Sequence, residues 1–496
     1  MRILFYILFF CLSINLIAQN NKKIKILNAD KTYANANIHP NYWRLVGNVS
    51  FSHNNAVMYC DSAYHYTLEN KMKAFGNINI NQGDSLSLTG KTLTYFGKED
   101  KADIQGDILL VDQYMKLKTE QIIYNLSTNI ASYPKKGEII DNEKTINSKR
   151  GSYNSNIHKF IFTDSVVVTG KDYKILTDNM HYNSNSEITY FFGPSFIISD
   201  ENTIYCENGW YNTKTDIAQF RKNSYISNKS YLLKGDSLYY NKNTKYGKAF
   251  SQVKLIDTLE NITVFGGIAE YFESDEKIII SKKPMLQMIY DNDTLFMHAK
   301  QFISQNKINS KKILAYNNVK FFKSDLQGKC DSLSYNFKDS ILEIFEKPIL
   351  WSNKLQITAD SIKFLMHKGK INRMFLKPNP IMISEEDSFD YNQIRGKEMT
   401  AYFEKNKLKS MNVIGNGQSI FFIIDEEKKD KIGLNYTECT DLILYFKENQ
   451  LNEVTYEIKP NSITIPYKDI KEKDRYLKGF LWRGEEKPKN KEDIFN

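Results

Sequence analysis

The chain has 496 residues with only 23 Gly and 10 Pro, so no Gly- or Pro-rich linker divides it into conventional domains. Charged residues make up 25% and hydrophobic residues 41%, a balance that excludes a disordered chain and a helical membrane protein. Tyr (32) and Phe (30) far outnumber Trp (4), and this bias favours β-structure. The net charge of +9 is a mild preference for anionic partners, but no dense Lys/Arg tract indicates a nucleic acid.

The N-terminal segment, residues 1–18, is predicted to be a secretory signal peptide. Arg2 supplies a positive start, Ile3 to Ile17 is almost continuously apolar, and the small Ala18 is followed by polar residues. The apolar run is short for a membrane span, so an uncleaved anchor is the weaker alternative. The mature chain is expected to begin near Gln19 and to leave the cytoplasm.

An internal repeat of 29 residues is the strongest pattern in the sequence. It is visible in Gly90-Lys-Thr-Leu-Thr-Tyr95, Thr119-Glu-Gln-Ile-Ile-Tyr124 and Thr177-Asp-Asn-Met-His-Tyr182. We call the closing aromatic residues the anchors. The anchors are Tyr66, Tyr95, Tyr124, Tyr153, Tyr182, Tyr211 and Tyr240, and then, at longer and less regular steps, Tyr271, Phe302, Tyr335, Phe364, Tyr402 and Tyr445. Self-similarity at a fixed period predicts a solenoid built from one supersecondary unit.

Each repeat has two halves, and both are typical of strands. In the second half, the run from Ala102 to Leu110 alternates small or apolar residues, Gly106 among them, with polar ones. This alternation predicts a strand with one wet face. The first half changes phase at Gly90, where a bulge or corner would turn both ends of the strand onto one concave surface. We therefore expect an elongated all-β solenoid of about 13 two-strand repeats with bent antiparallel strands.

The repeat divides the mature chain into three parts. Residues 19–255 keep the regular period, residues 256–470 continue it with longer turns, and residues 471–496 form a charged tail or cap. An open stack leaves unpaired backbone at its first and last strands. Residues near 40–58 and 445–467 are therefore expected to dock another protein, or a second copy of this chain, by strand addition.

The position four residues before the anchor is acidic in many repeats. These acidic residues are Glu120, Asp178, Glu207, Asp236, Asp331, Asp360, Glu398 and Asp441. We expect them to lie on a turn or on the outer face, where a charge at a strand edge favours solubility. Contact with a ligand is the alternative.

Enzyme chemistry is not indicated. Gly83-Asp-Ser-Leu86 and Gly235-Asp-Ser-Leu238 match the motif of the GDSL hydrolases, and Asp178-Asn-Met-His181 matches its partner motif. However, Asp-Ser-Leu recurs with the repeat, as in Cys330-Asp-Ser-Leu333, whereas a nucleophilic Ser with its base occurs once in an active site. No pair among the seven His has metal-ligand spacing with Cys or a carboxylate, and no Gly-rich phosphate loop is present. We expect no catalytic residue, no metal and no cofactor.

Three segments at the start of the repeat carry a resemblance to a known family. Leu45-Val-Gly-Asn-Val-Ser-Phe51, Cys60-Asp-Ser-Ala-Tyr64 and Ala74-Phe-Gly-Asn-Ile78 resemble the OstA-like family. That family includes the periplasmic lipopolysaccharide-transport bridge protein and the soluble domain of its outer-membrane partner. The resemblance covers residues 40–255 well and 256–465 loosely, and the length is similar to that of the long Bacteroidetes-type members. It implies a bent-strand jellyroll (β-taco) whose groove holds acyl chains, located in the periplasm or at the outer membrane.

The function implied by this resemblance is lipid binding in lipopolysaccharide transport and outer-membrane assembly. The partners would be lipopolysaccharide or a related glycolipid, and other lipopolysaccharide-transport proteins. Shielding acyl surface from water supplies about 25 cal/mol per Å², so no covalent chemistry is needed. The groove lining is expected at Leu93, Tyr95, Ile104, Ile108, Ile122, Tyr124, Met180, Tyr182, Leu238, Tyr240, Leu333, Tyr335, Ile362 and Phe364.

Periodicity alone does not distinguish an open groove from a filled core. A passive β-repeat scaffold or adhesin is one alternative function. An outer-membrane β-barrel, in which the same alternation points outward, is another.

Overall fold

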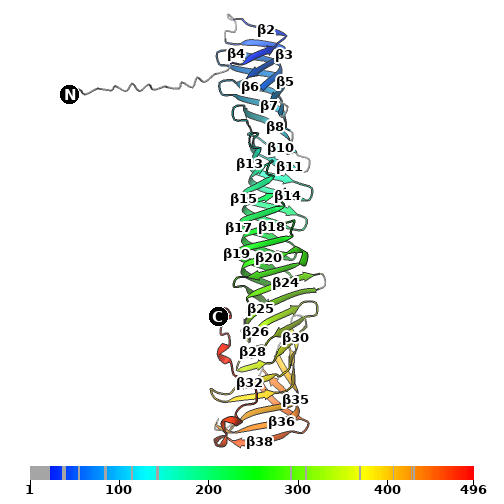
Figure 1. Cartoon of the computed structure of the whole chain (residues 1–496), viewed down its shortest axis with the longest axis vertical. Helices are drawn as coiled ribbons and strands as arrows, with labels where there is room; N and C mark the ends of the chain where they lie inside the picture. Colours follow the sequence, from blue (N-terminus) through cyan, green and yellow to red (C-terminus); the bar gives the residue numbers. More distant parts are fainter. Residues whose placement is uncertain are drawn as a thin grey trace, which may run out of the picture. The chain divides into compact units, whose positions relative to one another are not determined.

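The computed structural model describes residues 23–35, 41–53, 56–82, 86–112, 115–140, 144–290, 293–307, 310–367, 370–405, 407–425, 427, 430–448 and 450–496. The expected signal peptide, residues 1–18, lies outside them. The described residues form 38 strands and five short 3-10 turns, with no α-helix among them (Figure 1). The all-β fold is confirmed. Two compact units divide the chain, one ending at Ile197 and the other beginning at Ile198. The boundary at residue 255, drawn from the regularity of the repeat, stays a prediction.

The strands up to the boundary between the units lie as follows. They are β1 (Lys25–Asn28), β2 (Lys31–Tyr33), β3 (Trp43–His53), β4 (Ala56–Tyr66), β5 (Lys71–Gln82), β6 (Leu86–Phe96), β7 (Lys101–Asp112), β8 (Lys116–Asn125), β9 (Ile130–Tyr133), β10 (Gly137–Ile140), β11 (Thr145–Ser148), β12 (Arg150–Asn154), β13 (Lys159–Thr169), β14 (Tyr173–Asn183) and β15 (Ile188–Ser199), the last of which crosses the boundary.

The second unit contains the remaining elements. Its strands are β16 (Thr203–Asn212), β17 (Ile217–Ser227), β18 (Tyr231–Asn241), β19 (Tyr246–Asp257), β20 (Ile262–Phe272), β21 (Lys277–Ser281), β22 (Met285–Tyr290), β23 (Asp293–His298), β24 (Gln301–Lys307), β25 (Ser310–Lys323), β26 (Leu326–Asn336), β27 (Ile341–Phe345), β28 (Ile349–Ser352), β29 (Leu355–Thr358), β30 (Ser361–His367), β31 (Lys370–Lys377), β32 (Ile381–Glu385), β33 (Tyr391–Arg395), β34 (Glu398–Glu404), β35 (Lys407–Ile424), β36 (Lys431–Lys447), β37 (Gln450–Glu457) and β38 (Asn461–Pro466). The 3-10 turns are η1 (Glu273–Asp275), η2 (Tyr467–Asp469), η3 (Glu472–Asp474), η4 (Gly484–Glu486) and η5 (Asp493–Phe495).

Within each unit, strands that follow one another in the chain pair antiparallel, and each long run bends at its middle. β6 pairs with β5 on one side and with β7 on the other, and both ladders shift register at the bend. Where the bend interrupts the ladder more strongly, the two halves of a run are separate strands, such as β21 and β22, which both pair with β20. The two halves of every bent run thus form the two walls of a folded ribbon.

The bend is built from two consecutive residues with left-handed backbone in the second strand of a repeat. Gly106 and Asp107 have φ of 86° and 46°, and pairs at 47–48, 76–77, 164–165, 222–223 and 251–252 repeat this conformation. Gly, Asn and Asp tolerate it best. The predicted strand is present as β7, and Gly106 lies at a bulge inside it that the alternation did not indicate. Because the corner contains two residues, the alternation of apolar and polar side chains has the same phase on both sides of it. The alternation therefore does not indicate the bend.

The acidic side chains of the repeat brace these corners. Asn223 Nδ2 donates to Glu207 at 2.7 Å, and Asn379 Nδ2 donates to Asp360 at 3.1 Å. In a third repeat, the backbone N–H of Gly415 donates to Asp441 Oδ1 at 2.8 Å. Two of these carboxylates accept from the side-chain amide of a corner Asn and the third accepts from a corner backbone N–H, which gives these three residues a structural role in place of ligand contact.

Replacing a corner glycine is expected to destabilise the first unit. Gly76 has φ of 76°, and a Cβ there would clash with the Asp61 carboxylate. Gly193 has φ of 88° with nothing within 4 Å of its Cβ position, so Gly193→Ala carries the backbone strain without the clash. In urea unfolding, we expect Gly76→Ala to lower the free energy of unfolding by at least about 1 kcal/mol more than Gly193→Ala does. The reason is that Gly76→Ala also displaces the carboxylate that binds Asn77. Equal losses would contradict this role of Asp61.

The anchors form a row on the inner surface over most of the chain. In the first unit, Tyr95 lies opposite Ala102, which lies opposite Tyr124 on its other side. In the second unit, Ala218 separates Tyr211 from Tyr240 in the same way. Alternation of a ring with a small residue lets successive tyrosines pack at one depth.

Three anchors are assigned to the wrong face, and a fourth lies at a different depth. The inward residues are His65, Ala401 and Leu444, whereas Tyr66, Tyr402 and Tyr445 point outward from the same strands. In the fourth case Ser304, not Phe302, lies in register with the row. A shift of one residue moves a side chain to the other face of a strand, so an aromatic residue next to the inward position satisfies the spacing but points outward.

The edges of the stack differ from the prediction at one end. β3 is not an edge, because β1 and β2 pair with its outer side and β4 with its inner side. The exposed strands at that end are therefore residues 25–33, not residues near 40–58. At the other end, β37 and β38 pair with β36, and among the described residues they have no strand on their other side.

The charged segment at the C-terminus folds back over unit 2 (Figure 1). We call residues 467–496 the strap. It covers an outer face on which Trp351, Ile383 and Ile420 are no more than 1% exposed. Leu477 of the strap packs against Ile420, Phe422 and Leu434, and near the chain end Phe495 lies 4.7 Å from His298.

Two buried glutamines hold the backbone of the strap. Gln393 Nε2 donates to the carbonyl of Arg475 at 2.7 Å, and its Oε1 accepts from the N–H of Leu477 at 2.8 Å. Gln356 makes the same pair of contacts with Leu481 O and Arg483 N, at 2.7 and 2.8 Å. Each side-chain amide thus donates one hydrogen bond to the strap backbone and accepts one from it, as the backbone of a neighbouring strand would. These four hydrogen bonds involve only backbone atoms of the strap and do not depend on its side chains. The strap can therefore bind an apolar face although most of its side chains are charged.

Acid is expected to loosen the strap. Hydrogen bonds from Arg483 and then Lys329 lower the pKa of Glu486 to about 2. A carboxyl whose folded pKa is depressed stabilises the folded state above its unfolded pKa of about 4.3 and loses that contribution as pH falls toward 2. Hydrogen exchange of residues 480–490, corrected for intrinsic rates, should therefore accelerate between pH 5 and pH 2.5. Glu486→Gln should remove this step, and a step of unchanged size in that variant would show that another group causes it.

Candidate groove in the second unit

The predicted lining residues of the first unit form a filled core. Seven of them are at most 2% exposed: Leu93, Tyr95, Ile104, Ile108, Ile122, Tyr124 and Met180. Polar contacts also close the mouth of the ribbon there, since Tyr95 Oη lies 2.6 Å from His53 Nδ1 on the opposite wall and the Lys144 ammonium lies 4.4 Å from the Tyr182 ring. These seven side chains point inward, and their contact with a lipid stays a prediction.

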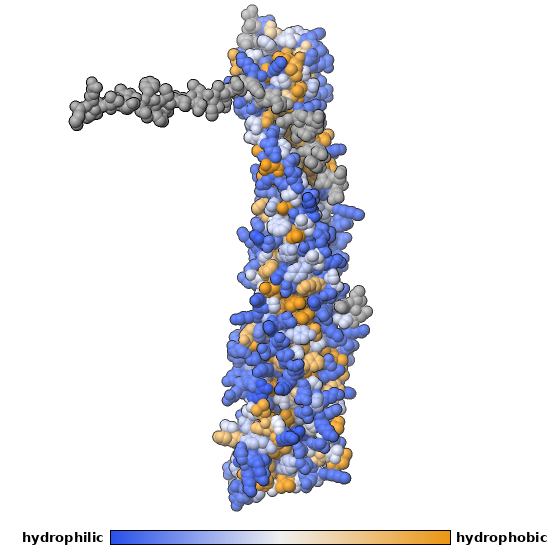
Figure 2. All heavy atoms as spheres, in the orientation of Figure 1, coloured by the Kyte–Doolittle hydropathy of each residue, from blue (hydrophilic) through white to orange (hydrophobic). Residues whose placement is uncertain are grey.

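The inner surface of the second unit is less tightly closed. Leu238, Leu333, Ile362 and Phe364 point inward and are buried, at 7%, 4%, 1% and 3% exposure. Tyr240 and Tyr335, however, are half-buried at the mouth of the ribbon. In the view of Figure 2, hydrophilic side chains cover the flanks of this unit and hydrophobic ones gather between them. The rings of Tyr240 and Tyr335 are thus partly accessible to solvent.

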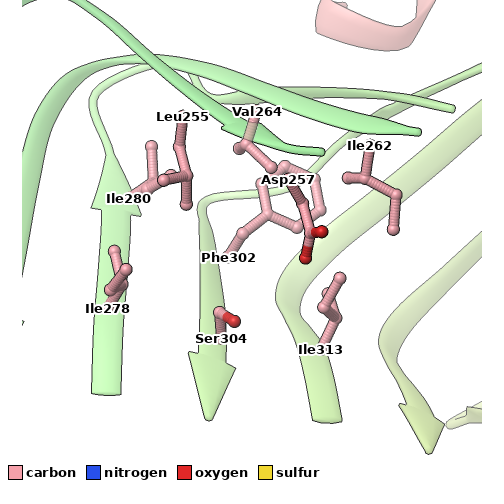
Figure 3. A pocket seen from close by; sticks show the side chains of 9 residues that line it. All are labelled: Leu255, Asp257, Ile262, Val264, Ile278, Ile280, Phe302, Ser304 and Ile313. Atoms are coloured by element: carbon pink, nitrogen blue, oxygen red, sulfur yellow. The ribbon is translucent and has the colours of Figure 1, made fainter. Parts of the chain in front are cut away.

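A cavity of about 30 Å³ opens between the two walls of unit 2 (Figure 3). One wall contributes Leu255, Asp257, Ile262 and Val264 from β19 and β20, and the other contributes Ile278, Ile280, Phe302, Ser304 and Ile313 from β21, β24 and β25. We call this space the groove cavity. It has room for about one water molecule, and seven of its nine lining side chains are apolar. Its walls must separate before it can hold a longer apolar chain.

The rim of the mouth carries tyrosine and carboxylate side chains. Tyr240 Oη donates to Glu273 Oε2 at 2.6 Å, and both burial and this carboxylate raise the pKa of Tyr240. Burial is also the main cause that raises the pKa of Tyr271 to about 12. Both phenols stay protonated at neutral pH and can donate hydrogen bonds at the edge of an apolar space. The rim is therefore amphipathic, with rings facing inward and polar groups facing water.

An ion pair crosses the mouth beside the groove cavity. Lys311 Nζ lies 2.6 Å from Asp257 Oδ2 and 3.4 Å from Glu260 Oε1. Lys311 follows the turn between β24 and β25, and the two acids belong to the opposite rim, at the end of β19 and in the turn after it. The sequence analysis missed this pair, because charged residues 51 and 54 positions apart give no local signal.

The Asp-Ser-Leu segments occupy equivalent places in the repeat. Ser237, Ser332 and Ser361, the last from the related segment Asp360-Ser-Ile362, lie in β18, β26 and β30, each three residues before an anchor. Ser361 Oγ donates to the carbonyl of Lys377 at 2.7 Å. The recurrence of this serine at one position of several repeats agrees with a structural element.

A turn signal after the anchor was also missed. Asn follows the anchor directly at 125, 154, 183, 212, 241 and 336. Asn183 Oδ1 accepts from the backbone N–H groups of Asn185 and Ser186 at 3.1 and 2.9 Å. This Asx turn fixes the hairpin that forms the rim. The Tyr-Asn dipeptide could have located the rim turns from the sequence.

Comparison with known proteins identifies the first half of the chain. A family model described as OstA-like protein matches residues 21–178 and 174–236. Residues 21–236 therefore match the OstA-like family. The family is associated with lipopolysaccharide transport, its members are transport and binding proteins, and they are periplasmic or associated with the outer membrane. The described residues of this OstA-like chain contain no helix long and apolar enough to cross a bilayer.

The other comparisons add no functional argument. No curated protein matches the OstA-like chain significantly. Among solved structures, the WD40 domain of SCAP from fission yeast matches with 8% identity and a TM-score of 0.14, covering 64% of this chain and 86% of that one. The looser resemblance of residues 256–465 to the family remains a prediction.

Proposed function

We propose that this protein is a periplasmic lipid-binding protein of lipopolysaccharide transport and outer-membrane assembly, and that it carries acyl chains in the groove of unit 2. The observation that carries the proposal is the apolar groove cavity between two walls whose mouth is lined by half-buried tyrosines. Each Å² of acyl surface shielded there contributes about 25 cal/mol. The match to the OstA-like family supports the choice of a lipopolysaccharide or related glycolipid as cargo.

The proposal assigns the predicted lining residues two different roles. Leu238, Tyr240, Leu333 and Tyr335 would contact the acyl chains, because they face the interior of unit 2 near its mouth. Seven of the eight predicted positions of the first unit, all but Tyr182, would keep the ribbon folded, because they are at most 2% exposed.

Photo-crosslinking at two adjacent isoleucines tests this function. Ile278 lines the groove cavity and is 4% exposed, whereas Ile279 is the next residue of β21 and points to the other face. A benzophenone amino acid at Ile278 should capture lipopolysaccharide in living cells, and one at Ile279 should not. Thermal unfolding of both variants must show that the label leaves the fold intact. Equal capture at the two positions, or capture at neither in folded protein, would sink the proposal.

The exposed edge formed by β37 and β38 supports docking by strand addition, either of another lipopolysaccharide-transport protein or of a second copy. Ile463 in β38 is 52% exposed, and the strand has a free edge among the described residues. A lysine on an edge strand disfavours pairing with a further strand. Ile463→Lys should therefore weaken self-association in sedimentation velocity and leave the circular dichroism spectrum unchanged. If sedimentation is the same in both proteins, the docking site lies elsewhere.

A further inference from the structure

The ion pair between the two rims of unit 2 is placed to control entry to the groove. Lys311 and its partners Asp257 and Glu260 are partly buried, with 25%, 23% and 37% of their side-chain surfaces exposed. The ammonium group also lies 4.7 Å from the ring of Phe337. A charge that is partly removed from water and faces an aromatic ring depends on its carboxylate partners more than a fully exposed one does.

The ion pair stands directly over the groove cavity. Asp257 is itself a lining residue, and in Figure 3 its carboxylate projects into the space between the walls. Lys311 precedes the lining residue Ile313 by two positions on one face of β25, so both partners point inward from their rims. Any molecule that enters sideways at this point must part them.

Entry by an acyl chain requires the rims to separate, because the cavity of about 30 Å³ holds roughly one water molecule. Separation leaves the Lys311 ammonium without its carboxylates at the edge of an apolar space, which is unfavourable unless another anion replaces them. A phosphate attached to the entering acyl chain supplies that anion at the right place.

We infer that Lys311 is the gate of the groove, and that an amphiphile carrying a phosphate headgroup and an acyl chain opens it by replacing Asp257 on the ammonium. This inference rests on the proposed lipid-binding function and adds the headgroup chemistry that the gate selects. A neutral acyl compound must break the same ion pair without compensation and therefore enters more slowly.

Stopped-flow binding of two probes to the full chain tests the gate. The probes are fluorescently labelled lysophosphatidic acid and the monoacylglycerol with the same labelled chain, which differ in the phosphate alone. Lys311→Met keeps the aliphatic stem and removes the charge. Lys312→Met is the matched control, because Lys312 is the next residue of β25 and points to the other face. Exchange of both partners, Asp257→Lys with Lys311→Asp, restores the ion pair without the cation on its original rim.

In the wild type and in Lys312→Met, the phosphate probe should bind faster than the neutral probe. In Lys311→Met the neutral probe should gain about fivefold in rate, the effect of losing one ion pair of moderate strength, and the preference for phosphate should disappear. The exchanged pair should restore slow entry of the neutral probe.

Two outcomes would overturn the inference in distinguishable ways. If Lys311→Met behaves as Lys312→Met toward both probes while both bind, the gate is wrong and lipid binding stands. If no variant and no wild-type protein binds either probe, lipid binding itself fails and the gate fails with it.

Discussion

Removal of residues 471–496 is expected to make the protein associate through the outer face of unit 2. The deletion uncovers Trp351, Ile383 and Ile420, which are buried under the strap. It also leaves the amides of Gln356 and Gln393 without the backbone groups that they bind. A contiguous apolar patch of this kind drives aggregation. Size-exclusion chromatography and binding of a hydrophobic dye should show larger species and higher fluorescence than the full chain gives.

Two leucines of the strap provide a matched test that keeps the chain intact. Leu477 is 5% exposed and packs against Ile420 and Phe422, whereas the side chain of Leu481 is exposed in the same segment. Leu477→Ala should weaken docking of the strap by about 3 kcal/mol, which corresponds to about a hundredfold faster hydrogen exchange in residues 474–483. Leu481→Ala should stay near the wild-type rate. Similar rates for the two variants would mean that the glutamines alone hold the strap.

Aspartate at Ile122 is expected to unfold the first unit. Ile122 is 0% exposed and lies opposite Ile104 in the core, so the substitution removes a buried apolar side chain and leaves a carboxyl without a partner. The combined cost exceeds about 4 kcal/mol, a large part of the 5–15 kcal/mol that stabilises a typical domain. Urea unfolding followed by circular dichroism should show a much lower midpoint, or no folded baseline for this unit.

The control for this prediction is the next residue in the strand. Ile123 points to the other face of β8 and is partly exposed, so Ile123→Asp places the same charge in water. Its cost should stay within about 1 kcal/mol, mainly from the like charge of Asp103 directly opposite. If Ile122→Asp were equally mild, the interior of the first unit would be open to water, and its residues would again be candidates for the lipid groove.

The repeat, the β-strands and the row of inward anchors were predictable because each depends on the spacing of residues that are close in the sequence. The step of 29 residues from Tyr95 to Tyr240 places these anchors in register, and the structure pairs them through Ala102 or Ala218 as a row requires. The same reasoning failed at Tyr66, Tyr402 and Tyr445. An aromatic residue on the outer face satisfies the same spacing to within one residue, and only strand pairing decides which of two neighbours points inward.

The corner was located on the wrong strand for a related reason. Gly90 is at a register shift, as expected, but the left-handed backbone lies across the ladder at Gly106 and Asp107. A corner of two residues preserves the period of two on both sides, so the alternation of apolar and polar residues does not reveal where the corner lies. The Gly-Asn and Gly-Asp dipeptides at 47–48, 76–77 and 106–107 are its sequence signal, since these residue types tolerate positive φ.

The sequence by itself determined the class of fold, the period of the repeat and the face of most core residues, because these depend on side chains that are close in the chain. Only the tertiary structure decided that the first unit is filled, that Lys311 meets Asp257 across the mouth, and that the strap lies on Gln356 and Gln393. These contacts join residues between 51 and 127 positions apart. Their energies depend on burial and on distance in space, and neither quantity is encoded in the spacing of one segment.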